Sequence, residues 1–147
     1  MPKLNAYLSF DGTCAEAMKY YARLLDAKLE ALITYEQAGS QMPVPPGDGH
    51  RIMHAYLVHP EFELMAGDTP PEVPYRGVNG VMMTLTYATA AEARRVFDAL
   101  ADGGQVTMPL GETFWADAFG MVTDRFGVPW GINGGSKPRL GGCRAAS

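Results

Sequence analysis

Few side chains in this sequence are suited to proton transfer, and the best placed is a histidine in an alternating segment. His54 and Tyr56 alternate with apolar residues at positions 53, 55 and 57. If the apolar residues face a core, His54 and Tyr56 face the opposite side of a strand. Histidine is the natural base near neutral pH, so His54 is a candidate catalytic residue. The alternative is a structural histidine held by a backbone group or a tyrosine hydroxyl.

Glu112 is the second candidate catalytic residue. It opens the segment Glu112-Thr113-Phe114-Trp115, and Glu36 stands at the equivalent place 76 residues earlier. A carboxylate here could act as a general acid or base or fix a ligand. It could equally accept hydrogen bonds from backbone N–H groups in a turn. Glu63, on the predicted face of Met65, is interpreted as a solvated carboxylate at a strand end.

Side chains suited to holding a small organic molecule surround these groups. Aromatic rings offer flat apolar surface and methionines offer adaptable apolar surface, although most such side chains in any protein belong to the core. The predicted substrate-binding residues are Asn5, Tyr7, Tyr56, Met65, Met82, Thr84, Trp115, Phe119 and Asn133.

Two alternating segments, residues 4–10 and 81–87, predict strands with two different faces. One face of each is apolar and should pack on a helix. The other face is mixed, which is typical of the lining of a small-molecule cavity. The mixed faces carry Asn5, Tyr7 and Ser9 in the first segment, and Met82, Thr84 and Thr86 in the second.

Each of these strands leads into a predicted helix that opens with Thr-x-x-Glu. Thr13 with Glu16, and Thr89 with Glu92, predict two capping boxes at an offset of 76 residues. Three further strands follow each helix, so the chain contains a β-α-β-β-β unit twice and is of the α+β class. The predicted strands are 28–36, 51–59 and 62–67, then 105–110, 115–123 and 128–133.

The C-terminal half of the chain carries a long signature. Residues 112–133 contain Glu-Thr-Phe-Trp, then Phe-Gly-x-Val-x-Asp-x-Phe-Gly-Val-Pro-Trp, then Ile-Asn. With Tyr-x-Ser-Phe at residues 7–10, the Ala-Glu-Ala-Met-x-Tyr-Tyr helix and His54, the chain resembles the PhnB-like branch of the glyoxalase/bleomycin-resistance (vicinal oxygen chelate) superfamily. The resemblance covers residues 4–133.

The resemblance implies tandem βαβββ modules whose mixed sheets curl into a cup. We expect a single domain over residues 1–135, with modules at about 3–67 and 79–134, and a flexible tail over 136–147. Two such chains commonly complete each other's cups, so the resemblance also implies a homodimer.

Superfamily enzymes hold a divalent ion with four His or Glu side chains on the first and fourth strands of each module. The corresponding positions here are Asn5, Met65, Met82 and Gly131. One amide, two thioethers and a glycine are a poor ligand set, so we predict no metal ion and no other cofactor.

The sequence therefore favours a protein that binds a small organic ligand in the cup without a metal. Two alternatives stay open: a metal-dependent lyase or dioxygenase of the glyoxalase type, and a non-catalytic, antibiotic-type sequestering protein that takes cationic ligands. Members of this branch have been called demethylubiquinone methyltransferases. Neither strand-to-helix turn here has the glycine pattern of a Rossmann-type methyltransferase.

Composition excludes several partners. A net charge of −4 without a Lys/Arg cluster argues against nucleic acid. No apolar run approaches the roughly 18 residues of a membrane span, and no leader pattern is visible, so we expect a cytoplasmic protein. Of the two cysteines, Cys143 falls in the predicted tail. Cys14 is either a small helix residue or a thiolate favoured by the helix N-terminus.

Overall fold

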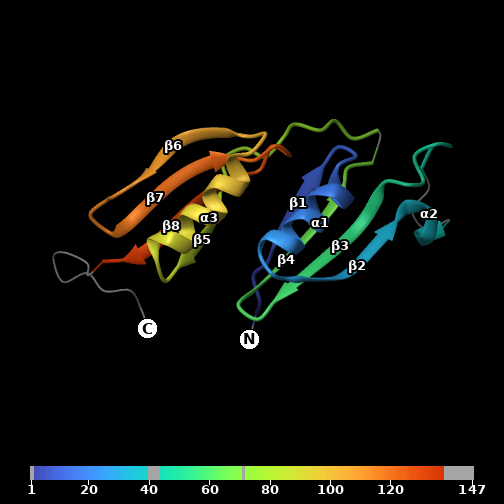
Figure 1. Cartoon of the computed structure of the whole chain (residues 1–147). Coiled ribbons are helices and arrows are strands. Elements are labelled where there is room, and N and C mark those ends of the chain that lie inside the picture. The colour runs from blue at the N-terminus through green and yellow to red at the C-terminus, as the bar shows by residue number, and fades with distance from the viewer. Residues whose placement is uncertain (1, 40–43, 71, 138–147) are drawn as a thin grey trace. The chain divides into compact units, whose positions relative to one another are not determined.

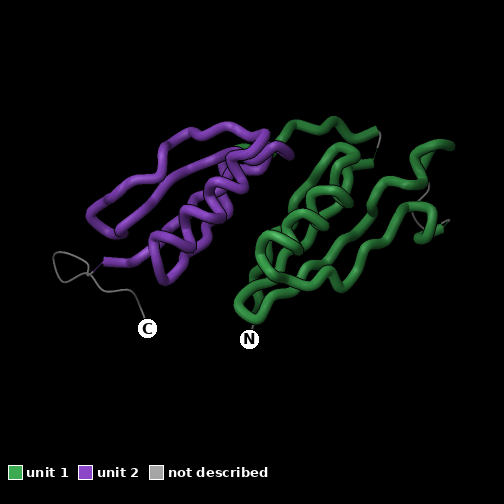
Figure 2. Tube along the Cα trace, viewed as in Figure 1, with its two compact units in different colours: residues 1–79 green, residues 80–147 purple. Residues whose placement is uncertain are grey.

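The computed structural model describes residues 2–39, 44–70 and 72–137. They fall into two compact units, residues 1–79 and 80–147 (Figure 2). Residues 138–147 of the predicted tail, and part of the long connection after residue 37, lie outside the described residues. Within the described ranges, no helix is long and apolar enough to cross a membrane.

The first unit is a four-stranded mixed sheet with one long and one short helix (Figure 1). Along the chain its elements are β1 (Ala6–Phe10), α1 (Cys14–Leu24), β2 (Lys28–Thr34), α2 (Tyr35–Ala38), β3 (Ile52–His59) and β4 (Phe62–Asp68). The strands lie in the order β1-β4-β3-β2. β1 runs parallel to β4, and the other neighbours are antiparallel.

The second unit repeats this arrangement without the short helix (Figure 1). Its elements are β5 (Met83–Tyr87), α3 (Ala90–Ala101), β6 (Gln105–Gly111), β7 (Ala116–Thr123) and β8 (Pro129–Ser136). The strand order β5-β8-β7-β6 is the counterpart of the first sheet. The predicted α+β class and doubled β-α-β-β-β unit are therefore confirmed. Each sheet is open, and the closing of the two into one cup stays a prediction.

The predicted strands differ from the observed ones at their ends. Leu4 is 99% exposed and Val81 is 56% exposed, because each lies before the first residue of its strand. Glu36 was expected at the end of a strand but lies in α2. The chain turns into this helix because Thr34 and Gln37 form a capping box, with N–H to side-chain oxygen distances of 3.1 and 2.8 Å.

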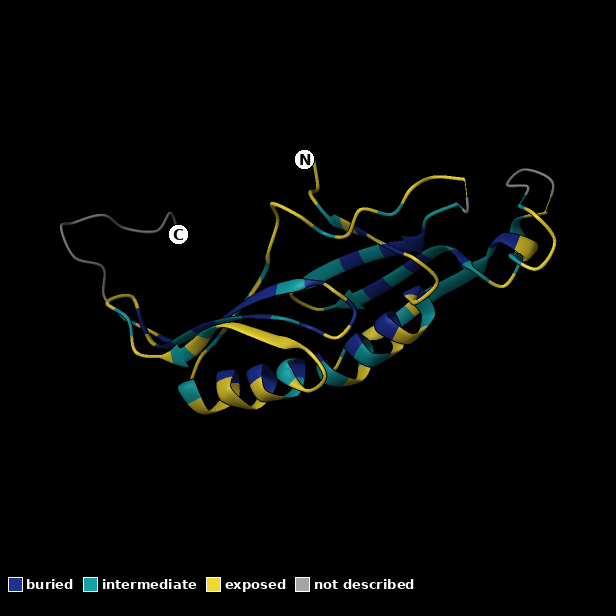
Figure 3. Cartoon of the chain, turned by 90° about the horizontal axis from the view of Figure 1, so that it is seen from above, coloured by how far each residue is buried: buried dark blue, intermediate teal, exposed yellow. Residues whose placement is uncertain are grey.

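Both long helices pack a single apolar stripe on their own sheet (Figure 3). The buried residues recur at spacings of three and four, which places them on one side of a helix. Burying a large apolar side chain stabilises a fold by about 1.5–3 kcal/mol. The stripes are Cys14, Ala17, Met18 and Tyr21 in α1, and Ala93, Val96, Phe97 and Leu100 in α3.

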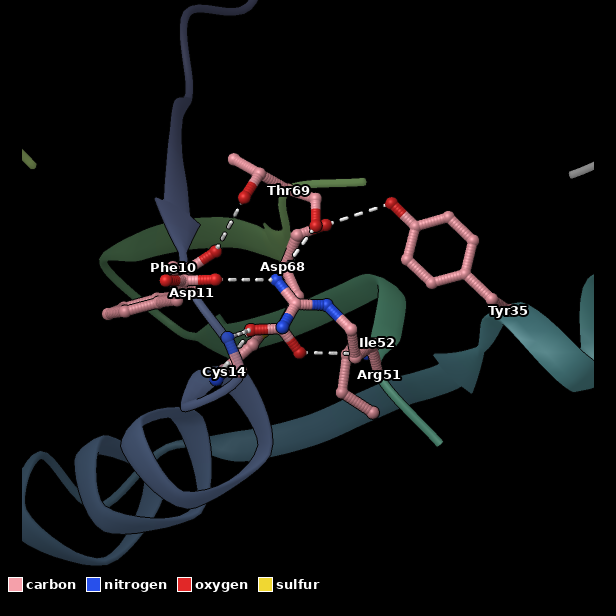
Figure 4. A network of polar contacts seen from close by, with 9 residues as sticks. Phe10, Asp11, Cys14, Tyr35, Arg51, Ile52, Asp68 and Thr69 are labelled. Atoms are coloured by element: carbon pink, nitrogen blue, oxygen red, sulfur yellow. Dashed lines mark hydrogen bonds and ion pairs between the residues drawn. The ribbon is translucent and has the colours of Figure 1, made fainter. Parts of the chain in front are cut away.

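The buried carboxylate of Asp68 fixes the start of α1 to the first sheet (Figure 4). Asp68 ends β4 and is 4% exposed. Its Oδ1 accepts hydrogen bonds from the backbone N–H groups of Gly12 at 2.8 Å and Cys14 at 3.1 Å. Its Oδ2 accepts from the N–H of Ile52 at 2.8 Å. One side chain thus satisfies backbone donors of the β1–α1 turn and of β3.

Two neighbouring side chains close this junction. The Tyr35 hydroxyl donates to the carbonyl oxygen of Asp68 at 2.8 Å. Arg51 Nη2 donates to the Asp11 carboxylate at 2.9 Å and to the Thr69 carbonyl oxygen at 2.8 Å (Figure 4). The Arg51 Nε is buried without a partner among the described residues. The junction ties the ends of β1, β3 and β4 to both helices of the unit.

In the second unit a glycine stands where Asp68 stands in the first. Gly134 pairs with the last residue of β5, as Asp68 pairs with the last residue of β1. A Cβ on Gly134 would lie 2.5 Å from the carbonyl oxygen of Thr89, at the start of α3. The helix therefore packs directly on the backbone of β8, which only glycine allows.

The predicted capping box at Thr13 is wrong, and the one at Thr89 is partly confirmed. The Thr13 side chain makes no capping hydrogen bond, because the longer β1–α1 turn presents the helix N–H groups to Asp68 instead. Thr89 Oγ1 accepts from the Glu92 N–H at 3.2 Å. The Glu92 carboxylate accepts from the Thr89 hydroxyl at 3.0 Å rather than from the backbone.

Replacing Asp68 with alanine should lower the free energy of unfolding by about 3 kcal/mol or more, because three backbone donors lose their acceptor. Asp68→Asn keeps one acceptor oxygen and should lose less. Urea unfolding followed by circular dichroism measures both. Asp98→Ala, which removes an exposed carboxylate from α3, should change stability by at most about 0.5 kcal/mol. Equal stability of the Asp68→Ala and Asp98→Ala proteins would contradict this role.

Candidate functional site

One face of the first sheet is covered by α1, and the opposite face carries five of the predicted site residues. Tyr7, Met65 and Tyr56 pair in a row across β1, β4 and β3. Side chains two residues apart along a strand share a face. We call this surface the first open face; its predicted residues are Asn5, Tyr7, His54, Tyr56 and Met65.

Tyr7 lies across the first open face rather than projecting from it. Its hydroxyl donates to the Met53 carbonyl oxygen on β3 at 3.1 Å, so the side chain crosses β4. A Cβ on Gly67 would lie 2.7 Å from the Tyr7 oxygen, so the crossing requires glycine in β4. Burial raises the pKa of Tyr7, which keeps the phenol a donor.

His54 contacts Tyr7 through its ring. The two ring centroids lie 6.0 Å apart at an interplanar angle of 27°. The Tyr7 hydroxyl donates to Met53, so it is not a donor to the imidazole. His54 is half-buried on β3, and its role as a base stays a prediction.

Glu63 receives three side-chain donors beside this stack. The Tyr56 hydroxyl donates to Glu63 Oε1 at 2.6 Å, and Asn5 Nδ2 donates to the same oxygen at 3.4 Å. The Lys3 ammonium forms an ion pair with Oε2. The Glu63 side chain is only 17% exposed, so its interpretation as a solvated carboxylate is wrong.

These contacts set the protonation states of the cluster. The hydrogen bond from Lys3, followed by the one from Tyr56, lowers the pKa of Glu63. The same hydrogen bonds raise the pKa of Lys3 and of Tyr56. At neutral pH the cluster therefore holds a carboxylate, an ammonium and a protonated phenol.

The second sheet gathers the other predicted binding residues on the face opposite α3. Thr84 pairs with Gly131, and Phe119 pairs with Asn133. The Met82 side chain lies over Gly131, where a Cβ would be 2.8 Å from the Met82 methyl carbon. We call this surface the second open face; its predicted residues are Met82, Thr84, Trp115, Phe119 and Asn133.

Trp115 is fixed at the second open face by a hydrogen bond from its indole N–H and by contacts of its ring with two phenylalanines. Its indole Nε1 donates to the Asn133 side-chain oxygen at 3.0 Å. Its ring meets Phe119 edge-on at a centroid distance of 5.2 Å and Phe114 at 4.9 Å. Trp115 remains 37% exposed. The indole N–H is thus satisfied while part of the ring stays accessible.

Glu112 follows β6, and its carboxylate forms an ion pair with Lys137. The hydrogen bond from Lys137 lowers the pKa of Glu112. Lys137 Nζ also donates to the Thr113 carbonyl oxygen at 3.0 Å. Glu112 and His54 belong to different units, and neither unit contains both predicted catalytic residues.

The donors at the positions implied by the superfamily do not fit a divalent ion. Asn5 is engaged with Glu63, and the Met82 thioether fills the space over Gly131. Hard ions prefer charged oxygen ligands, and zinc prefers imidazole, carboxylate or thiolate. Among the residues that the structure describes, no group of three or more His, Cys, Asp and Glu could hold a metal.

Cys14 is buried in the first turn of α1. Burial, with a smaller contribution from the nearby Asp68 charge, raises the pKa of the thiol to about 12. The hypothesis of a thiolate at the helix N-terminus is therefore wrong, and Cys14 is a small core residue.

Sequence reasoning missed several residues that shape the two units. Asp68 lies one residue beyond the predicted strand 62–67 and the first predicted module, and nothing in the sequence connects Lys3 with Glu63. Asp124, 4% exposed, accepts at Oδ2 from the Trp130 indole at 2.8 Å. Gly67 did carry a usable signal, because a glycine inside a strand often marks the close approach of another group.

Comparison with known proteins places the chain among relatives of similar length. It matches the family described as 3-demethylubiquinone-9 3-methyltransferase over residues 2–133. It is 36% identical to protein YjdN of Escherichia coli over 142 residues, covering 88% of this chain and 93% of that protein.

Solved structures agree with this placement. The crystal structure of protein PA1353 from Pseudomonas aeruginosa has a TM-score of 0.83 at 46% identity, covering 91% of this chain and 98% of that one. A PhnB protein from Bacillus cereus has a TM-score of 0.76 at 28% identity, covering 90% and 99%. A glyoxylase/bleomycin resistance protein/dioxygenase domain from Frankia, at 14% identity and a TM-score of 0.59 over 96% and 94% of the two chains, shares the fold.

The thiol of Cys14 should react with 5,5′-dithiobis(2-nitrobenzoic acid) only as fast as the first unit opens, because the reagent needs a thiolate and solvent access. A Cys143→Ser background leaves Cys14 as the single thiol. Absorbance of the released anion at pH 8 follows the reaction, and the urea-unfolded protein gives the reference rate. Labelling of the folded protein at that reference rate would contradict the assignment.

Proposed function

The chain belongs to the PhnB-like 3-demethylubiquinone-9 3-methyltransferase family of the glyoxalase/bleomycin-resistance superfamily, and from that premise we propose that it binds a small, partly apolar organic molecule on its open sheet faces without a metal ion. The observation that carries the proposal is the second open face. There a tryptophan, a phenylalanine and a methionine lie together around a single amide, Asn133.

The composition of this face suits a ligand with an apolar body. Ligand sites in proteins are mostly apolar and contain a few fixed polar groups. Phe119 and Trp115 stand edge-on to each other, so a planar group can stack on one ring while it meets the edge of the other. Met82 adds an adaptable wall, because its side chain is flexible and polarisable.

The first open face offers a small molecule a more polar surface of its own. The Tyr7 and Tyr56 hydroxyls already donate to the Met53 carbonyl oxygen and to Glu63, so toward a ligand each can act as a hydrogen-bond acceptor. In this proposal His54 is the group for proton transfer, because it lies in the sheet beside these phenols. Glu112 has a weaker claim, since its carboxylate is already engaged by Lys137.

The competing functions have less support. A metal-dependent lyase or dioxygenase needs ligands that the positions of Asn5, Met65, Met82 and Gly131 do not supply. A sequestering protein for cationic antibiotics would use an acidic rim beside the aromatic rings, and Lys137 neutralises Glu112 there. Methyl transfer by a Rossmann-type enzyme needs a mostly parallel sheet with helices on both faces, whereas each sheet described here has one parallel pair of strands.

The proposal is tested with N-phenyl-1-naphthylamine, a neutral and partly apolar fluorescent probe. The rise in probe fluorescence on binding measures its affinity, and Trp115 is available for contact because it remains 37% exposed. Phe119→Ala should weaken probe binding about fivefold, the loss of roughly 1 kcal/mol of aromatic contact. Binding should be unchanged by EDTA.

Val106→Ala is the matched control for this experiment. Val106 is 42% exposed on β6 and pairs with Val122, which is buried on the side of α3. This variant should bind the probe like the wild type. Equal weakening by Val106→Ala and Phe119→Ala, or binding that disappears with EDTA, would overturn the proposal.

A further inference from the structure

We infer that Glu63 forms a binding site for a primary ammonium group at the edge of the first open face, and that Lys3 of the same chain occupies this site. The inference rests on the proposed function, because it assumes that the open faces bind small organic molecules and assigns a charged site to the first of them.

The Glu63 carboxylate is held in place by hydrogen bonds from neighbouring side chains. Oε1 of Glu63 accepts from Tyr56 at 2.6 Å and from Asn5 at 3.4 Å, while Oε2 accepts from the Lys3 ammonium. The Glu63 side chain is 17% exposed, whereas that of Lys3 is 66% exposed. The acceptor is therefore covered and fixed by two neutral donors, and its cation arrives from a solvent-exposed side chain.

A hollow of about 350 Å³ adjoins Glu63. It lies between the segment before β1 and the β3–β4 turn, where the His59 ring stacks on Phe62 at 4.6 Å and Glu61 is exposed. The charged groups at the hollow are thus two carboxylates and Lys3. Without Lys3 the site is negative, which favours a cation and disfavours an anion.

A primary ammonium is the cation that the donors and acceptors fit. Lys3 itself shows that an –NH₃⁺ group reaches Oε2. Within the described residues no group of three or more His, Cys, Asp and Glu could hold a metal, so a compact organic cation suits the site better than a hard divalent ion. The apolar body of such a ligand would lie toward Met65, two residues along β4 on the same face.

Lys3 acts in this scheme as a tethered competitor. It stands three residues before β1, so its ammonium is held near Glu63 at an effective concentration on the order of millimolar. A free amine must displace it, and the ion pair is weak because Lys3 is largely solvated. Removing the Lys3 ammonium should therefore tighten the binding of a free amine.

The test is calorimetric titration of benzylammonium chloride at pH 7 into full-length protein. Lys3→Met should bind the probe about threefold more tightly than the wild type, because the tethered competitor is gone and a solvated ion pair changes affinity only a few-fold. Glu63→Gln should lose binding, and Tyr56→Phe should weaken it while leaving the carboxylate in place. Lys28→Met removes a lysine that pairs with exposed Glu30, and it should match the wild type.

Two readouts keep the inference separate from the proposed function. Benzyl alcohol, which has the same ring without the charge, should not distinguish Lys3→Met from the wild type. Binding of N-phenyl-1-naphthylamine, measured by its fluorescence on the same samples, reports the second open face and should be intact in Glu63→Gln. Equal affinity of Lys3→Met and wild type for benzylammonium, or full affinity in Glu63→Gln, overturns the ammonium site even when the naphthylamine still binds.

Discussion

In each unit the N-terminus of the long helix packs against the C-terminal part of a central strand, α1 against β4 and α3 against β8. The rest of the structure depends on how this contact is made. In the first unit the Asp68 carboxylate fills the contact and accepts three backbone N–H groups. In the second unit Gly134 leaves no side chain there, and the helix rests on the strand backbone. Both solutions commit one face of the sheet to the helix and leave the other face open.

Because the helix covers one face of each sheet, the side chains on the opposite face are free to form the two open faces. Alternation along each strand sends every second side chain away from the helix, so residues distant in sequence meet in rows. Glycines in the central strands then let large side chains lie flat: Tyr7 crosses Gly67, and Met82 covers Gly131. The two units thereby carry different surfaces on one architecture, a polar one around Glu63 and an aromatic one around Trp115.

The sequence predicts the features that depend on local periodicity. The doubled unit follows from the repeated strands and helix starts, and the separation of Tyr7 from the helix-facing residues follows from alternation alone. The failures involve partners far apart in the chain. Thr13 has a capping motif, yet Asp68, 55 residues later, takes that role. The Glu63 carboxylate was interpreted as solvated because its main partner, Lys3, lies 60 residues earlier in the chain. Glu112 was equated with Glu36, although a capping box bends the chain into α2 only in the first unit.

The central claim is that this chain presents binding chemistry on its open faces through side chains rather than through a bound ion. Calorimetric titration of Mn²⁺, Ni²⁺ and Zn²⁺ into untagged protein that has been treated with EDTA and dialysed tests it most directly. The account predicts no stoichiometric binding at micromolar concentrations, because Asn5, Met65, Met82 and Gly131 provide no suitable donors. One ion bound per chain, with the binding lost in Glu63→Gln or Met82→Ala, would contradict it.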